Sequence, residues 1–192
     1  MRRIPVLATL IVLIAVGIMI RLGFWQLDRM HEKEALLARY AAESTNPRPV
    51  LFPAASKGAA ELALYRKSQV ACAKVSSIQS IAGRNLRGEV GYVHVALCEI
   101  EAGRTAHVQI GWLASPAPPA WSGGEVAGTI APFGEGFAKL VAQPPLAGLE
   151  ASAKPDPNDL PNNHWSYAVQ WFLFALTALV IYAIALRKRL RG

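Results

Sequence analysis

Two long apolar runs lie near the ends of the chain, and each has about the length of a membrane span. The first, from Ile4 to Ile20, holds no charged residue, and the second, from Tyr167 to Leu186, holds one side-chain amide, Gln170. At about 1.5 Å per helical residue, the second run reaches about 30 Å, the thickness of the hydrocarbon layer. Both runs predict transmembrane helices, because a helix pairs its own backbone groups where lipid offers no partner.

Helical spacing of apolar residues continues beyond the first run. Leu27, Met30 and Leu37 recur near helical spacing with charged residues between them, as far as the segment Asn46-Pro47-Arg48-Pro49. Proline lacks an amide donor and restricts the residue before it, so this segment ends the helix. The pattern predicts a helical extension that is exposed to water on at least one side.

The middle of the chain changes to short apolar or alternating runs separated by turn residues, which is typical of β-strands. The clearest hairpin covers residues 92–113. With a two-residue loop at Ala102-Gly103, Leu97 would face Val108, and Cys98 would face His107. We expect strands in four regions, which are residues 70–75, 92–100, 104–113 and 126–130.

These elements predict an α+β membrane protein, in which N- and C-terminal transmembrane helices flank a small antiparallel β-rich extracytoplasmic domain. We expect the two helices to lie side by side, because both serve the same small domain. The predicted order is a cytoplasmic tail at 1–3, transmembrane helix 1 at 4–25, a helical extension at 26–45, a periplasmic β-rich domain and loop at 46–163, transmembrane helix 2 at 164–186 and a basic cytoplasmic tail at 187–192.

Composition and charge agree with a membrane location. Of 192 residues, 53% are hydrophobic and 17% are charged, below the roughly 25% charged residues of a soluble domain. The hydrophobicity also excludes a disordered chain. Six of the 20 Lys and Arg residues lie in the two tails, and residues 4–186 carry a net charge of only +1. The basic charge therefore does not form a nucleic-acid face, and it places both termini in the cytoplasm and the central domain in the periplasm.

The first span has a competing interpretation, a cleaved signal peptide. Its apolar core is longer than the usual core of about 7–15 residues, and no small-x-small cleavage site follows it. We therefore expect an uncleaved anchor. Because only Met1-Arg2-Arg3 precedes the span, without an Arg- and Ser-rich presequence, a bacterial inner membrane is favoured over a mitochondrion.

Motifs for catalysis are missing from the sequence: it contains no phosphate-binding Gly-Lys-Ser/Thr loop, no His-Glu-x-x-His, no Gly-x-Ser-x-Gly and no Cys-x-x-Cys. We expect a protein that is not an enzyme, with a membrane enzyme as the less favoured alternative.

His94, His107 and Cys98 share one face of the predicted hairpin. There, Cys98 and His107 would either begin a metal site or form a half-buried polar pair. Cys72 and Cys98 would instead form a disulfide in an oxidising compartment if their backbones approach closely.

The ends of the two spans hold the remaining candidate residues. His164 lies at the mouth of the second span beside Trp165, where aromatic rings would half bury a flat apolar group such as haem. The alternative is a hydrated interfacial histidine. On the first helix, Trp25, Gln26 and Arg29 lie about a turn apart. They serve either as an interface anchor or as a surface facing His164, with Arg29 available for a haem propionate.

These two segments carry a family resemblance. Residues 22–29 (Leu-Gly-Phe-Trp-Gln-Leu-Asp-Arg), followed by Lys33, and residues 161–168 (Pro-Asn-Asn-His-Trp-Ser-Tyr-Ala) resemble the corresponding segments of the surfeit locus protein 1 family. Weaker matches occur between them in the family's order, at Tyr65-Arg66, Gly91-Tyr92 and Gly111-Trp112-Leu113.

The resemblance implies a membrane-anchored, noncatalytic chaperone for assembly of haem-copper cytochrome c oxidase in respiratory chain biogenesis, which binds or delivers haem a for subunit I. It implies that His164 is the haem iron ligand, and helix-end geometry adds Trp25, Gln26, Arg29 and Tyr167 as further cofactor-binding residues. The implied partners are oxidase subunit I and the haem a synthesis machinery. The alternatives are a scaffold that stabilises subunit I without haem, and an unrelated membrane-anchored periplasmic binding module.

Overall fold

The computed structural model describes residues 5–53, 57–134 and 136–191. The chain divides into two compact units, one formed by residues 1–37 and 160–192 and the other by residues 38–159. The predicted tail at residues 1–3 lies outside the described residues, as do Ile4, at the start of the predicted first span, and Gly192, at the end of the predicted basic tail.

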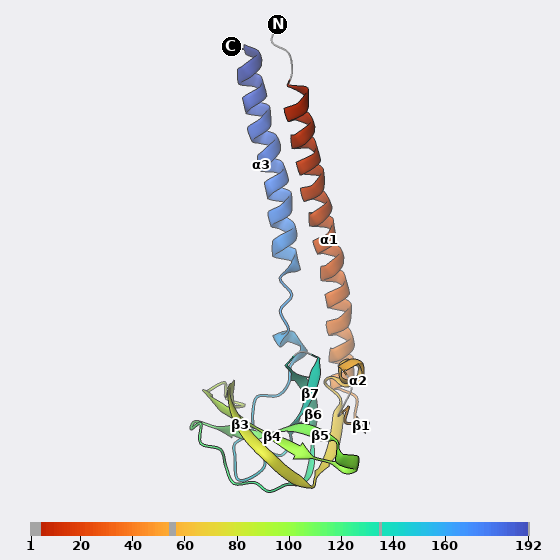
Figure 1. The fold of residues 1–192 in the computed structure, drawn as a ribbon, viewed down its shortest axis with the longest axis vertical. Helices are drawn as coiled ribbons and strands as arrows, with labels where there is room; N and C mark the ends of the chain where they lie inside the picture. Colours follow the sequence, from red (N-terminus) through yellow and green to blue (C-terminus); the bar gives the residue numbers. More distant parts are fainter. Residues whose placement is uncertain (1–4, 54–56, 135, 192) are drawn as a thin grey trace. The chain divides into compact units, whose positions relative to one another are not determined.

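The first unit is a pair of long antiparallel helices (Figure 1). Helix α1 extends over Val6–Ser44 and helix α3 over His164–Arg191. Both are long and apolar enough to cross a membrane. The predicted fold class, two terminal membrane helices that flank a β domain, is confirmed, and so is the expectation that the helices lie side by side.

The contact between α1 and α3 follows a seven-residue repeat. On α3, Ala168 and Ala175 are buried, with exposed fractions of 0% and 4%, and on α1 Val16 is buried at 6%. Polar contacts lie at both ends of this seam: Thr9 bonds to the hydroxyl of Tyr182, and Gln26 bonds to His164. The two contacts are about 26 Å apart along each helix, close to the hydrocarbon thickness of a bilayer. A seven-residue repeat is the spacing that keeps one seam of a helix facing its partner.

The second unit is a seven-stranded sheet in the order β1-β2-β6-β7-β5-β4-β3, accompanied by the short helix α2 (Lys57–Ala63). Two short 3-10 turns, η1 (Glu101–Gly103) and η2 (Pro157–Asp159), complete it. The strands are β1 (Val50–Leu51), β2 (Lys67–Cys72), β3 (Lys74–Arg84), β4 (Val90–Glu99), β5 (Thr105–Leu113), β6 (Gly124–Phe133) and β7 (Phe137–Ala142).

One bent strand closes the sheet into a barrel. Only Ala73 separates β2 from β3, and its N–H donates to the Glu99 carbonyl at 2.9 Å. Strand β2 pairs with β6, whereas β3 pairs with β4 at the other end of the strand order. Val108, Ile110 and Leu140 inside the barrel have no exposed surface. A disulfide between Cys72 and Cys98, with Cα atoms 5.3 Å apart, joins β2 to β4 beside the bend.

The structure corrects several expectations for this unit. The sheet is mixed, because β1 pairs with β2, and β5 with β7, in parallel. The predicted register near the hairpin turn is wrong: Leu97 faces His107 and Cys98 faces Ala106. The loop contains three residues rather than two, since the N–H of Ile100 bonds to the Arg104 carbonyl across η1. One residue of slip moves every side chain to the opposite face, so His107 does not share a face with Cys98.

Candidate cofactor site at the helix ends

The centre of the candidate site is a hydrogen bond between the two helices of the first unit. Nδ1 of His164, the first residue of α3, lies 2.7 Å from Oε1 of Gln26 on α1. Because an amide oxygen accepts only, Nδ1 carries the proton and donates it to Gln26. No other hydrogen bond to the imidazole occurs among the described residues, so Nε2 keeps its lone pair for another partner.

Close helix packing next to this bond holds the two residues together. A Cβ atom at Gly23 would lie 2.6 Å from Cε1 of Phe172, so only glycine lets α1 approach α3 this closely. The ring of Phe24 meets the same Phe172 ring edge-on, with centroids 5.5 Å apart. Gln26 follows Gly23 by three residues, about one helical turn, and so extends from the same side of α1 toward α3.

The other predicted cofactor-binding residues are not joined to this pair. The side chains of Trp25 and Tyr167 are 47% and 51% exposed, and no hydrogen bond or ring contact links either to His164 within the described part of the chain. Arg29 forms an ion pair with Glu32 on its own helix. The structure thus brings together His164 and Gln26. Among the described residues, no side-chain hydrogen bond, ion pair or ring contact joins Trp25, Tyr167 or Arg29 to this pair.

The chemistry of this pair would suit His164 as one ligand of haem iron. A histidine with one nitrogen fixed by a hydrogen bond and the other unprotonated is the form that ligates a metal. Trp165 and Tyr167 lie close to His164 in the sequence, and Trp25 precedes Gln26. The exposed rings of these three residues would offer apolar surface to a flat macrocycle. Arg29 would have to leave Glu32 before it could bind a propionate.

The metal site considered on the hairpin is wrong. Cys98 is in the disulfide, and no group of three or more His, Cys, Asp or Glu residues placed to hold a metal occurs in the described ranges. His94 is fully buried, and its Nδ1–H donates to the Ser80 hydroxyl at 3.0 Å, while that hydroxyl donates to the Pro116 carbonyl at 2.6 Å. Burial lowers the pKa of His94, which favours the neutral form of the ring.

His107 takes part in a different cluster on the outer face of β5 and β7. Its ring lies 4.5 Å from that of Phe133, and Nζ of Lys139 lies 5.5 Å from the same ring. His107 and Lys139 are partners in the parallel ladder. Burial lowers the pKa of the His107 imidazole and of the Lys139 ammonium, which disfavours the presence of both positive charges at once. The cluster is therefore an aromatic packing site with one ammonium over a ring.

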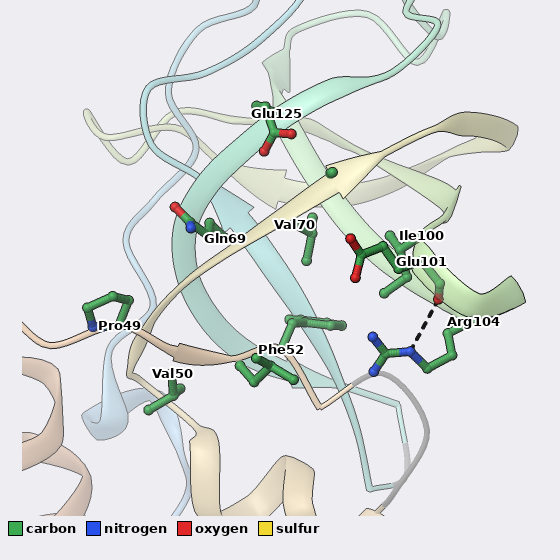
Figure 2. Close-up of a pocket in the computed structure, with 11 residues that line it drawn as sticks. Pro49, Val50, Phe52, Gln69, Val70, Ile100, Glu101, Arg104 and Glu125 are labelled. Atoms are coloured by element: carbon green, nitrogen blue, oxygen red, sulfur yellow. Dashed lines mark hydrogen bonds between the residues drawn. The ribbon is translucent and has the colours of Figure 1, made fainter.

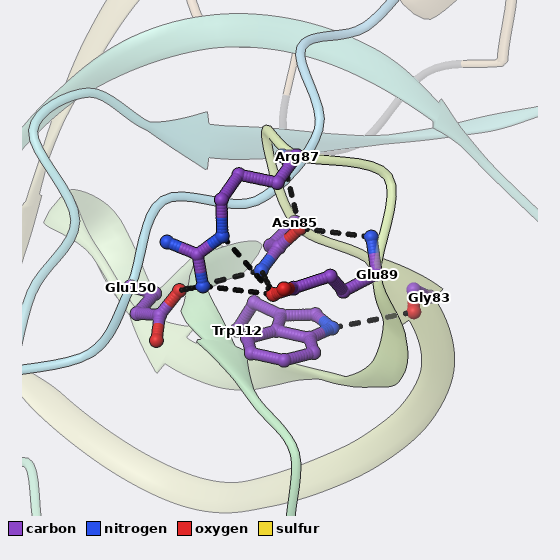
Figure 3. A network of polar contacts seen from close by, with 6 residues as sticks. All are labelled: Gly83, Asn85, Arg87, Glu89, Trp112 and Glu150. Carbon is purple, nitrogen blue, oxygen red and sulfur yellow. Dashed lines mark hydrogen bonds and ion pairs between the residues drawn. The ribbon is translucent and has the colours of Figure 1, made fainter.

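A polar network at the β3–β4 turn was not predicted (Figure 3). Arg87 binds the carboxylates of Glu89 and Glu150 at 2.7 and 2.9 Å, and the amide of Asn85 donates to both as well. The hydrogen bond from Arg87 lowers the pKa of Glu89. Glu150 is distant in sequence, so no local pattern would have shown this contact. Its members satisfy one another, and the network fastens the turn to the returning chain.

Both helix-end segments lie within the part of the chain that matches a known protein family. A family model described as SURF1 family matches residues 13–176, a range that includes both helix-end segments and the whole barrel. A search of curated proteins finds no match. The family, which is the surfeit locus protein 1 family, is associated with assembly of cytochrome c oxidase. By a match over most of its length, this membrane-anchored chain belongs to the SURF1 family.

Proposed function

We propose that this protein binds haem a and delivers it for subunit I during assembly of cytochrome c oxidase, with His164 as the iron ligand. The observation that carries the proposal is the 2.7 Å hydrogen bond between His164 Nδ1 and Gln26 Oε1. It fixes the tautomer in which Nε2 is free to bind iron. The family's association with oxidase assembly supplies the pathway in which such a site would act.

Each residue at the helix ends has a distinct part in this proposal. His164 presents a neutral ring nitrogen, and Gln26 holds that ring in orientation by accepting its other proton. Bound there, haem a would supply an iron with an open position for the imidazole nitrogen. Trp25 and Tyr167 would cover the macrocycle. Arg29, once released from Glu32, would pair with a carboxylate.

The proposal also includes the orientation in the membrane. The last helical turn of α3 carries Lys188, Arg189 and Arg191, and basic residues favour the cytoplasmic side. With two spans and both termini on that side, the barrel would lie in the periplasm of a bacterial inner membrane. The Cys72–Cys98 disulfide supports this side, since disulfides persist in oxidising compartments. The haem a synthesis machinery would act as donor, and subunit I as acceptor.

Absorbance spectroscopy of the full chain, purified in mild detergent from cells that make haem a, tests the proposal. We expect a Soret band that His164→Ala abolishes. The matched control is His31→Ala, which removes an exposed histidine of the same helix pair and should keep the band. A wild-type protein without a Soret band, or a band that survives His164→Ala, would overturn the assignment of His164.

Gln26 gives a finer test of the same site. Gln26→Leu removes the acceptor for Nδ1–H and should weaken haem binding by about 10- to 100-fold, the usual effect of losing a partner of a metal-binding histidine. Gln26→Glu keeps an acceptor and should restore most of the affinity. Haem titration of the purified variants measures both. Equal affinity of Gln26→Leu and wild type would show that the hydrogen bond does not orient the ligand.

A further inference from the structure

Strands β2 and β3 form one bent strand, and β6 pairs with one edge of its β2 part. On the opposite edge, the hydrogen-bond ladder of the barrel has a gap. Strand β1 covers the first part of this edge, where Val50 and Leu51 pair with Ser68 and Gln69. Beyond the bend, β4 covers the edge from Lys74 onward. Residues 70–72, between these two covered parts, have no strand beside them on that edge in the part of the chain that the structure describes.

Backbone groups face this gap. The N–H of Ala73 donates to Glu99 on the same edge, and an extended strand repeats its orientation every second residue. Ala71 therefore turns its N–H and C=O toward the gap, while Val70 and Cys72 turn theirs toward β6. No described residue forms a backbone hydrogen bond with Ala71 on the gap side. One donor and one acceptor at strand spacing are left open there.

A pocket of about 470 Å³ occupies the gap (Figure 2). Buried apolar side chains of Phe52, Val70 and Ile100 line it, with exposed fractions of 5%, 6% and 9%. The gap ends at Leu51 on one side and at the η1 turn on the other. The volume falls within the range of about 300–1,000 Å³ found for ligand pockets.

Charged side chains form the rim of this pocket. Glu101, Glu125 and Arg104 all line it, and no ion pair joins any of them to another described residue. Nε of Arg104 donates to the backbone carbonyl of Glu101 at 3.3 Å, as Figure 2 shows. Two carboxylates against one guanidinium give the rim a net negative charge, which favours a basic partner.

We infer that this pocket binds an extended segment of a partner protein, which adds a short strand between β1 and β4. Ala71 would pair with the backbone of the segment. Phe52 and Ile100 would receive an apolar side chain, and Glu101 and Glu125 would face basic residues beside it. Main-chain pairing supplies affinity in such strand addition, and side-chain pockets supply selectivity. The inference concerns the barrel alone and does not depend on haem binding at His164.

Fluorescence polarisation with the full chain in detergent tests this inference. The probe is a fluorescein-labelled peptide, Lys-Val-Thr-Val-Lys. It is compared with the same peptide N-methylated at Thr and with Glu-Val-Thr-Val-Glu. We expect saturable binding of the first peptide. The methylated peptide, which lacks one hydrogen-bond donor, and the acidic peptide, which would face like charges on the rim, should each bind at least about tenfold more weakly. Failure of all three to bind, or equal binding of the methylated peptide, would overturn strand addition, and preference for the acidic peptide would overturn the assigned charge.

Variants locate the binding to the gap. Ala71→Pro removes the open N–H without removing a bond to β6, and it should abolish binding. Combined Glu101→Gln and Glu125→Gln should remove the preference for the basic peptide while the barrel stays intact. The matched control is Glu99→Gln, an exposed carboxylate at the end of β4 that does not line the pocket. If the control weakens binding as much as the double variant, the peptide binds elsewhere and the inference is wrong.

Discussion

The helix pair and the β-barrel are held together by different means. In the most apolar stretches of α1 and α3, only 11% and 6% of residues are buried within the protein, so their contact is a narrow seam. In the barrel, by contrast, whole side chains such as Ile110, Ile130 and Leu140 are sealed from solvent. Apolar volume therefore stabilises the barrel, whereas a few matched positions and two polar contacts at the ends of the seam define the helix pair.

This difference bears on where the two proposed binding sites lie. The imidazole of His164 and the amide of Gln26 at one end of the helix seam are half-buried, so part of their surface remains accessible. In the barrel, buried polar groups such as Asn85 and His94 are surrounded by protein, and the accessible position is the gap in the ladder.

The largest effect is expected from removing core volume. Leu140→Ala empties a fully buried position on β7, and it should lower the free energy of unfolding of the barrel by about 2–5 kcal/mol. Leu86→Ala removes the same atoms from a side chain that is 57% exposed, and it should change stability by less than about 0.5 kcal/mol. Urea unfolding followed by the β-sheet circular dichroism signal measures both. Equal effects would contradict a barrel stabilised by its core.

The disulfide should contribute nearly as much. Replacing Cys72 and Cys98 by Ala removes a cross-link between residues 26 positions apart, which should cost the barrel about 3 kcal/mol. The contact between His164 and Gln26 lies in the other unit and should be unchanged. Urea unfolding measures the first effect, and haem titration the second. Loss of haem binding in this variant, at a urea concentration where the barrel is still folded, would show that the two units are not independent.

Helix packing should respond at Gly23 and not at Gly17. Gly23→Ala places a methyl group against the Phe172 ring, whereas a Cβ at Gly17 meets nothing within 4 Å. Overpacking typically costs about 1–3 kcal/mol, so Gly23→Ala should weaken the α1–α3 contact. Disulfide cross-linking between cysteines introduced at Val16 and Ala175 reports the contact. Unchanged cross-linking in Gly23→Ala, or a loss in Gly17→Ala, would place the seam elsewhere.

The smallest effect is a pH dependence of barrel stability. Burial holds the pKa of His94 below its usual value of 6.5, so below pH 6.5 the unfolded chain binds a proton that the folded barrel does not. The contribution of His94 is present above pH 6.5 and is lost as the pH falls, by at most about 1.4 kcal/mol per pH unit. His107 acts in the same direction. Urea unfolding at several pH values should show a shallower slope in His94→Gln, and an unchanged slope would exclude His94 as a source.

Sequence reasoning captured the features that depend on local pattern. The apolar runs predicted both membrane helices, and the two helix-end motifs indicated the family that the comparison then showed. A helical start at His164 and a turn near Gly103 also follow from short stretches of sequence. The pairing of Gln26 with His164, in contrast, requires the antiparallel alignment of two helices that are 138 residues apart.

The features of the barrel that could not be predicted from the sequence are mostly those set by the pairing of strands that are distant along the chain. Strand β7 and helix α2 were not expected, and of β3 only its first two residues fell within an expected strand region. The hairpin loop was predicted one residue too short, since Ala102 adopts a left-handed conformation with φ of 58° that is uncommon for alanine. The ladder gap at Ala71 arises from three strands distant in sequence, and a single strand pattern contains no trace of it.

The bend at Ala73 has a mechanical consequence. Because one continuous backbone enters both the β2–β6 and β3–β4 ladders, neither ladder can slide by itself: a slip of one position in the first would pull the second by the same distance. Such a slip would turn the inward side chains of both ladders outward at once. The continuous backbone through Ala73 therefore couples the register of the β2–β6 ladder to that of the β3–β4 ladder. The barrel resists sliding of its strands even at the bent strand's unpaired positions.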